Sequence, residues 1–170
     1  MWFPDAVFAR YAALAACLLL AGCFRPMYGS IEDGSSPVIE ELSRVNVAPI
    51  AGRVGQMVRN ELIYAFSAGE ATDAPYKLVV TLKEGTEETM LQRTGEAVTK
   101  IYELRANFTL IDVQSGKVLH GGSSASRASY DRTTQLFANQ RAARDAEDRA
   151  ARVVAENVKT RIAAYFASRG

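Results

Sequence analysis

The chain has few of the residues on which catalysis and metal binding most often depend. Its 170 residues include one histidine, His120, and two cysteines, Cys17 and Cys23, and these form no cluster with the spacing of a metal site. The sequence contains no Gly-rich phosphate loop and no Gly-x-Ser-x-Gly nucleophile elbow. A lone histidine beside two glycines is more often structural than catalytic. We therefore expect no enzymatic activity, no cofactor and no metal site.

An excess of charge of one sign is also missing. The 20 lysine and arginine residues are balanced by 19 aspartate and glutamate residues, which gives a formal net charge of +1. Proteins that bind nucleic acid usually concentrate positive charge to neutralise phosphates. The composition therefore argues against a nucleic-acid partner.

Long hydrophobic runs are limited to one short segment near the N-terminus, Tyr11–Leu20. A transmembrane helix needs about 20 apolar residues, so this segment is too short to span a bilayer, but it matches the apolar core of a secretory signal peptide. It ends in Leu20-Ala21-Gly22-Cys23, the pattern of a bacterial lipobox. We expect cleavage after Gly22 and acylation of Cys23, whose lipid chains hold the protein at a membrane. The alternative is an ordinary signal peptide cut near Ala21, which leaves Cys23 unmodified.

The residue after the lipobox cysteine bears on localisation. Bacterial sorting systems typically use aspartate there to retain a lipoprotein in the inner membrane, whereas this chain has Phe24. We therefore predict a lipid-anchored protein of the outer membrane that faces the periplasm. Because Cys17 leaves with the signal peptide and Cys23 carries lipid, the folded part has no thiol and must be stable without a disulfide.

Composition divides the chain into three parts. Residues 1–22 are the expected signal peptide, residues 23–43 the lipidated N-terminus with a flexible tether, and residues 44–170 a single α/β domain. The tether is predicted from its Gly, Ser, Pro and acidic residues, which are densest in Asp33-Gly34-Ser35-Ser36-Pro37.

Hydrophobic periodicity in the domain predicts the element order β-α-β-β-β-α. The expected strands are residues 45–50, 76–83, 98–113 and 118–130, and the expected helices are residues 52–67 and 134–167. A polar stretch at 84–95 separates the second strand from the third, and residues 114–117 form a hairpin turn. This order favours an α+β fold, a two-layer sandwich in which two helices pack on one face of a four-stranded mixed sheet.

Two segments of this fold allow more than one interpretation. The strand at 118–130 is rich in Gly, Ser and Ala, so it is either an edge of the sheet or a place where another backbone approaches closely. The last helix carries opposite charges about one turn apart, including Asp148 and Arg152, and we favour a solvated surface over a binding site there. Thr133 and Thr134 are the candidates for capping its first turn.

Four stretches carry a resemblance to a known family. The first, Cys23-Phe24-Arg25-Pro26-Met27-Tyr28-Gly29, lacks the glycine that usually separates the cysteine from the aromatic residue. The others are residues 52–62 (GRVGQMVRNEL), 102–112 (YELRANFTLID) and 145–150 (DAEDRA). In this order behind a lipobox, they resemble the alphaproteobacterial branch of the LPS-assembly lipoprotein family, LptE.

The resemblance implies a protein partner and a lipid ligand. Members of this family sit as a plug inside a large outer-membrane β-barrel, LptD, help that barrel to assemble, and help it deliver lipopolysaccharide (LPS) to the outer leaflet. The family has no catalytic residues, and it is credited with binding LPS, which carries clustered phosphates. By resemblance, Arg93 in the turn Arg93-Thr94-Gly95-Glu96 is a candidate LPS contact, and Lys100 and Arg105 add charge shortly after it. The alternative for Arg93 is a solvated turn residue.

A generic outer-membrane lipoprotein that acts as an adaptor or scaffold is the alternative function. The same two-layer fold could dock on another envelope complex, because fold does not determine function. A peripheral adaptor more often exposes one apolar patch. The sequence has no surplus of apolar residues outside the expected helix stripes and strand faces, which favours the plug.

Overall fold

In a computed structural model of the chain, the described residues are 37–66, 74–91 and 97–169. The expected signal peptide, Cys23, most of the expected tether and Arg93 lie outside these residues. No helix within the described ranges is long and apolar enough to cross a membrane.

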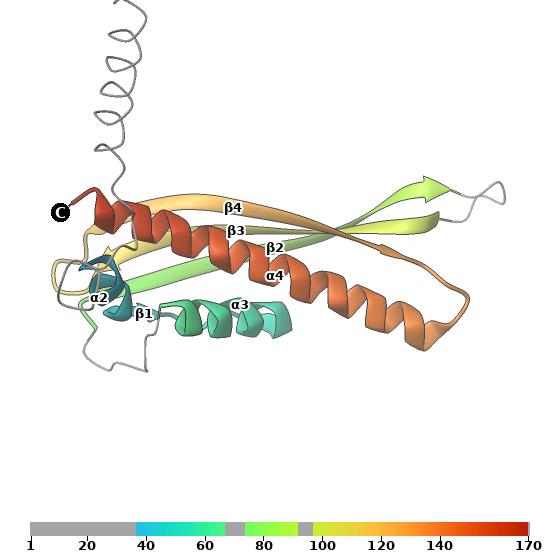
Figure 1. Ribbon diagram of the computed structural model, residues 1–170, viewed down its shortest axis with the longest axis horizontal. Coiled ribbons are helices and arrows are strands. Elements are labelled where there is room, and N and C mark those ends of the chain that lie inside the picture. The colour runs from blue at the N-terminus through green and yellow to red at the C-terminus, as the bar shows by residue number, and fades with distance from the viewer. Residues whose placement is uncertain (1–36, 67–73, 92–96, 170) are drawn as a thin grey trace, which may run out of the picture. The chain divides into compact units, whose positions relative to one another are not determined.

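The described strands form one mixed four-stranded sheet, as the sequence predicts (Figure 1). They are β1 (Val45–Val47), β2 (Tyr76–Leu91), β3 (Ala97–Asp112) and β4 (Val118–Asp131), and they lie in that order across the sheet. β1 is parallel to β2, whereas β2, β3 and β4 are antiparallel to one another. β4 is therefore an edge strand of the described sheet, as one of the two interpretations of its small residues predicts, and α4 also packs against it.

Three helices in the described part of the chain accompany this sheet. They are α2 (Pro37–Ser43), α3 (Gly52–Ala65) and α4 (Leu136–Ala167). α4 lies along β3 and β4, and both α2 and α3 contact α4 (Figure 1). The prediction of two helices is corrected to three, in the order α-β-α-β-β-β-α. α2 forms inside the segment expected to be a tether because Val38 and Leu42 lie one helical turn apart and are both buried.

The core lies between the helices and one face of the sheet. Alternate residues of β3 from Tyr102 to Leu110 are buried on this face, in keeping with the period of two in a strand. The apolar stripes expected on α3 and α4 are buried as well, and the alanines of α4 let it lie close to the sheet. The buried stripe residues are Val54, Val58 and Leu62 of α3 and Ala146, Ala150, Val154, Val158 and Ile162 of α4.

The β2–β3 hairpin extends further than the sequence predicts. Residues 84–91, expected to lie outside the strands, continue β2 and pair with β3. Hydrophobic alternation ends at Leu82, so the sequence period carries no strand signal beyond it. Backbone pairing continues nevertheless, and the directly opposed residues Glu88 and Lys100 add an ion pair of 3.0 Å across the strands.

The structure confirms the predicted turn between β3 and β4 but not the predicted N-cap of α4. The hairpin turn at 114–117 is confirmed, and Gly116 adopts the positive φ (68°) that such a turn requires. α4 begins at Leu136, and its N-cap is Gln135, which makes no side-chain capping bond. Neither expected threonine is the N-cap residue, and the Thr133 hydroxyl instead accepts a hydrogen bond from the backbone N–H of Gln135 at 3.3 Å.

Candidate functional site

Two of the three cations expected to contact LPS, Lys100 and Arg105, lie in the described residues, and they do not come together. Arg93 lies outside the described residues. Lys100 and Arg105 both belong to β3, but they are an odd number of positions apart, so their side chains lie on opposite faces of the sheet. Lys100 lies on the face that packs against the helices and pairs with Glu88. Of these two cations, Arg105 alone lies on the opposite face, which none of the described helices covers and which we call the uncovered face.

The uncovered face carries two further cations beside Arg105. Lys83 is directly opposite Arg105 in the β2–β3 register, and Arg127 is opposite Glu103 in the β3–β4 register. Glu103 Oε1 accepts hydrogen bonds from Arg105 Nη2 at 3.0 Å and from Arg127 Nε at 3.2 Å. We refer to Lys83, Arg105 and Arg127 as the basic band.

The basic band has more positive charge than its own carboxylate can balance. The hydrogen bond from Arg105, and the charge of Arg127, hold the pKa of Glu103 below its usual range. Lys83 and Arg105 are like charges directly opposite each other on neighbouring strands, which is unfavourable by itself. An anion bound at the band would relieve that repulsion. Sequence reasoning missed Lys83 and Arg127 because strand register decides which residues are neighbours.

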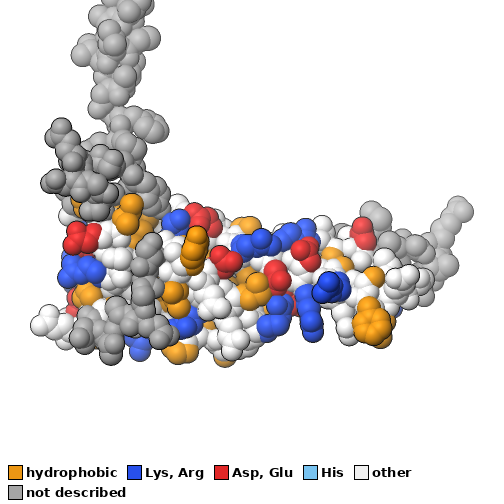
Figure 2. Space-filling view, turned by 60° about the horizontal axis from the view of Figure 1, so that its bottom comes forward, with side chains coloured by type: hydrophobic (Ala, Val, Ile, Leu, Met, Phe, Trp, Pro, Cys, Tyr) orange, Lys and Arg blue, Asp and Glu red, His pale blue; other side chains and the backbone are white. Residues whose placement is uncertain are grey.

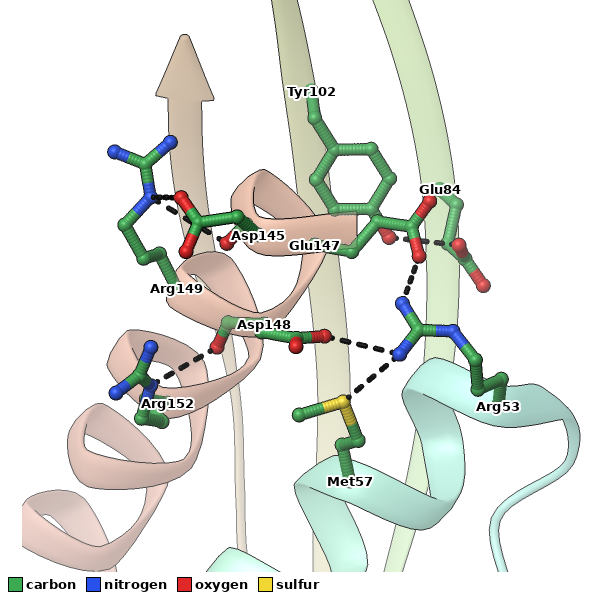
Figure 3. Close-up of polar contacts among 9 residues, drawn as sticks. All are labelled: Arg53, Met57, Glu84, Tyr102, Asp145, Glu147, Asp148, Arg149 and Arg152. Carbon is green, nitrogen blue, oxygen red and sulfur yellow. Dashed lines mark hydrogen bonds and ion pairs between the residues drawn. The ribbon is translucent and has the colours of Figure 1, made fainter. Parts of the chain in front are cut away.

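On the helical side of the molecule, Arg53 in the first turn of α3 joins α3 to α4 (Figure 3). Its guanidinium bonds to the carboxylate of Glu147, and its Nη1 donates to Asp148 Oδ1 at 3.0 Å and to the sulfur of Met57 at 3.3 Å. Hydrogen bonds to the two carboxylates raise the pKa of Arg53 above its ordinary value. Asp148 was expected on a solvated face, and the position of α3 alongside α4 explains its bond to Arg53.

Acidic and basic side chains are intermixed over this helical surface and form no large patch of one sign (Figure 2). Arg149 illustrates the arrangement, because it pairs with Asp145 at 3.0 Å and also donates from Nη2 to the carbonyl oxygen of Ser129 on β4 at 2.9 Å. The Arg149 and Asp145 side chains are 48% and 63% exposed, so water screens the pair and it adds little stability. The bond to Ser129 connects α4 to the edge strand.

We refer to Arg53, Glu147 and Asp148 as the Arg53 cluster, and Tyr102 on β3 is a buried residue that lies beside it (Figure 3). The residue is 5% exposed, and its hydroxyl donates a hydrogen bond of 2.7 Å to Glu84 Oε2 on β2. Burial first, and then the bond to Glu84, raises the pKa of Tyr102 far above its ordinary value. The tyrosine therefore stays protonated and acts as a donor.

Three of the four stretches that carried the family resemblance lie in the described residues, and they meet at this place. Arg53 comes from the stretch 52–62, Tyr102 from 102–112, and Glu147 and Asp148 from 145–150. Separate parts of the sequence thus supply two neighbouring sets of bonded polar side chains, Arg53 with Glu147 and Asp148 between α3 and α4, and Tyr102 with Glu84 on the sheet (Figure 3). Sequence spacing alone cannot show this, because the contacts span more than 90 positions of the chain.

A cleft of about 360 Å³ adjoins this group, between α4 and the sheet. It is lined by residues 84–86 of β2, by Tyr102 and Tyr130, and by Ala143 and Glu147 of α4. The lining is predominantly polar, with two carboxylates and two phenol rings. It contains no lysine or arginine.

Neither the cleft nor the rest of the described chain offers a metal site. No group of three His, Cys, Asp or Glu side chains that could hold an ion occurs within residues 37–66, 74–91 and 97–169. His120 has a structural environment instead. Its ring stacks on Tyr165 with the centroids 5.1 Å apart and lies 6.0 Å from the ring of Phe108.

The sequence model of the lipopolysaccharide-assembly family LptE matches residues 42–162. The chain belongs to the LptE family. The matched range covers α3, all three long strands and most of α4, and therefore includes both the basic band and the Arg53 cluster. No curated protein matches the sequence.

Solved structures of bacterial lipoproteins share the fold. A lipoprotein from Caulobacter crescentus is 25% identical, with a TM-score of 0.64, and the match covers 76% of this chain and 96% of that one. Rare lipoprotein B from Shewanella oneidensis is 12% identical, with a TM-score of 0.56 over 71% of this chain and 93% of that one. A minor lipoprotein from Acinetobacter baumannii is 16% identical, with a TM-score of 0.52 over 72% and 92%.

Membership of the LptE family gives the protein a role in LPS assembly, and the structural relatives support its assignment as a lipoprotein of the bacterial envelope. The similarity to the Caulobacter structure agrees with the alphaproteobacterial branch that the sequence resemblance indicated. The family is one of LPS-assembly lipoproteins and is not a family of enzymes.

Proposed function

We propose that this protein is an outer-membrane lipoprotein, anchored through acylated Cys23, that plugs the LptD β-barrel, helps it assemble and assists delivery of LPS to the outer leaflet. The observation that carries the proposal is the match of residues 42–162 to the LPS-assembly family. The uncovered face of the sheet supports it. Thr81, Asn107 and Ser123 lie side by side there, and all three are exposed, short and polar. Such a surface suits close polar contact with the wall of a barrel.

The basic band is the part of this surface that suits the anionic groups of LPS. Arg105 and Arg127 are each 60% exposed at the side chain and can hold a phosphate through a planar pair of N–H donors. Lys83 supplies a third positive charge opposite Arg105. Lys100 is less suited to this role, because it lies on the other face, is 25% exposed and is already paired with Glu88. Arg93 stays a proposed contact on the strength of the resemblance.

The plug is tested by affinity purification of the tagged, lipidated protein in mild detergent, followed by mass spectrometry. We expect a large β-barrel in stoichiometric amount. A Cys23→Ala variant is the control for the anchor, and we expect it to be absent from the outer membrane. Recovery of an inner-membrane transport complex, or of no partner, would contradict the plug and favour the generic adaptor.

The basic band is tested by LPS pull-down with Lys83→Glu and Arg105→Glu together. We expect about tenfold weaker binding, the scale of one lost charge-assisted hydrogen bond. Arg152→Glu is the matched control, because Arg152 is exposed on α4, away from the uncovered face. Equal LPS recovery by the band variant and the control would show that the basic band does not bind LPS.

A further inference from the structure

We propose that the cleft between α4 and the sheet binds a guanidinium or ammonium group, carried by an arginine or lysine side chain of the barrel wall. The inference rests on the proposed function, because the barrel is the partner that presents the side chain. It goes further by assigning one recognition pocket on this chain and the chemistry of the group that fills it.

The cleft offers acceptors for hydrogen bonds and negative charge. Its lining includes the carboxylates of Glu84 and Glu147 and the hydroxyls of Thr86, Tyr102 and Tyr130. Glu84 Oε2 accepts from Tyr102, but a carboxylate has lone pairs for several donors. Because no lining residue is a lysine or arginine, the group that complements the cleft is a cation.

The aromatic rings and the polarity of the lining narrow the ligand further. A guanidinium or ammonium group is attracted to the face of a tyrosine ring, and a guanidinium can also bond a carboxylate through two parallel N–H donors. A fatty acyl chain requires an apolar lining, which this cleft lacks. The cleft is therefore suited to a cationic side chain and poorly suited to the acyl chains of LPS.

Arg53 shows that α4 already accepts a guanidinium at the rim of the cleft. Its bonds to Glu147 and Asp148 hold a cation on the same helix that lines the cleft (Figure 3). Arg53 itself comes from α3 and does not line the cleft. Glu84, which lies on β2 and is exposed, is the lining carboxylate that Arg53 does not neutralise. Glu84 is thus the residue on which an incoming cation would depend most.

The geometry of the fold explains why this cleft exists. The buried apolar stripe of α4 begins at Ala146, and towards the start of the helix the small residue Ala143 lines the cleft together with the two tyrosines. A larger side chain at that position would fill the space. The cleft therefore lies where the apolar core ends and the polar part of the sheet begins.

The test is co-purification of the barrel with Glu84→Gln and Glu84→Lys variants of the full, lipidated chain. We expect Glu84→Lys to lower the barrel recovered per lipoprotein by roughly tenfold and Glu84→Gln by a few-fold, because charge reversal repels the incoming cation. Glu156→Lys is the matched control. Glu156 is exposed on α4, does not line the cleft and is not on the uncovered face of the sheet, and we expect recovery like that of wild type.

The outcomes separate this inference from the proposed function. If wild type recovers no barrel, the proposed function fails and this inference falls with it. If wild type and Glu84→Lys recover equal amounts of barrel, the cleft inference is overturned and the plug stands. Glu84→Gln keeps an oxygen that can accept from the Tyr102 hydroxyl, so a loss of barrel by this variant with an unchanged thermal unfolding curve excludes misfolding as the cause.

A photocrosslinking amino acid at Thr86 provides a second readout that does not depend on a charge change. Thr86 lines the cleft and is exposed. We expect a crosslink to a barrel peptide that contains a lysine or arginine within reach of the probe. A crosslink to an uncharged barrel segment, or none in a complex that still contains the barrel, would contradict the inference.

Discussion

The two faces of the sheet differ sharply although they share the same strands. On the helical face of β3, Leu104, Ala106 and Leu110 are fully buried. On the uncovered face of the same strand, Arg105 and Asn107 are exposed, and Glu103 takes part in a polar network. Neighbouring residues of one strand thus have different roles. The helical face supplies stability, and the uncovered face supplies polar surface for a partner at little cost to the fold.

The largest loss of stability is expected from a substitution in the core, on the face of the sheet that packs against the helices. Leu104→Ala removes a fully buried side chain and should lower the free energy of unfolding by about 2–5 kcal/mol. Asn107→Ala, on the uncovered face of the same strand, should change it by less than about 0.5 kcal/mol. Urea unfolding of both variants measures the difference. Equal losses would mean that the uncovered face is also part of the core.

Gly121 and Gly122, which are adjacent in β4, allow a second comparison of the two faces of the sheet. A Cβ at Gly122 would lie 2.9 Å from the Phe108 ring, whereas a Cβ at Gly121 would lie 3.4 Å from a backbone oxygen on the other face. Gly122→Ala should therefore destabilise by about 1–3 kcal/mol through overpacking. Gly121→Ala should cost clearly less. Thermal unfolding of the pair measures this, and the reverse order would show that Phe108 moves aside without penalty.

Tyr102 lies where the apolar core gives way to the polar cleft, so its removal should have an intermediate effect. Tyr102→Phe keeps the packing, loses the bond to Glu84 and should cost about 1 kcal/mol. Because the pKa of Tyr102 is raised in the folded state, the folded protein keeps a proton that the unfolded chain releases above about pH 10. Stability from this group is full below that pH and declines above it. Unfolding curves from pH 8 to 11 should show a smaller alkaline decline in the variant, and an unchanged decline would be inconsistent with a buried, protonated tyrosine.

The smallest effect is expected at the exposed link between the helices. The Arg53 side chain is 45% exposed, so solvent screens its pairs with Glu147 and Asp148. Arg53→Ala should cost less than about 1 kcal/mol, and added salt should reduce that cost. Denaturant titrations at low and high salt measure it. A loss of several kcal/mol, insensitive to salt, would show that the cluster is a structural element of the core.

The sequence predicted the parts of the fold that carry a hydrophobic period. Alternation from Tyr102 to Leu110 and the apolar stripe of α4 both appear as buried faces. The sequence did not predict the segments that have no hydrophobic period. Residues 84–88 of β2 have no apolar side chain, and α2 is a short helix whose aliphatic residues, Val38, Ile39 and Leu42, are too few to show a helical period.

The candidate sites were predictable only in part, for the same reason. Arg105 could be selected from the sequence as an exposed cation, but its neighbours Lys83 and Arg127 depend on strand register. The bonds of Arg53 depend on where α3 lies beside α4. Lys100 shows the opposite case. It is close to Arg105 in sequence, but an odd spacing along β3 places the two side chains on opposite faces of the sheet.

The most direct test of the account asks whether the uncovered face contacts the barrel. The chain has no cysteine after Cys23, so Asn107→Cys introduces a single thiol on that face and Asn157→Cys a comparable one on the exposed side of α4. Maleimide labelling is measured for each variant, first alone and then in the complex co-purified with the barrel. We predict rapid labelling of Asn107→Cys in the free protein and strong protection in the complex, with weaker protection of Asn157→Cys. Equal labelling of Asn107→Cys in both states would contradict the claim that this face meets the partner.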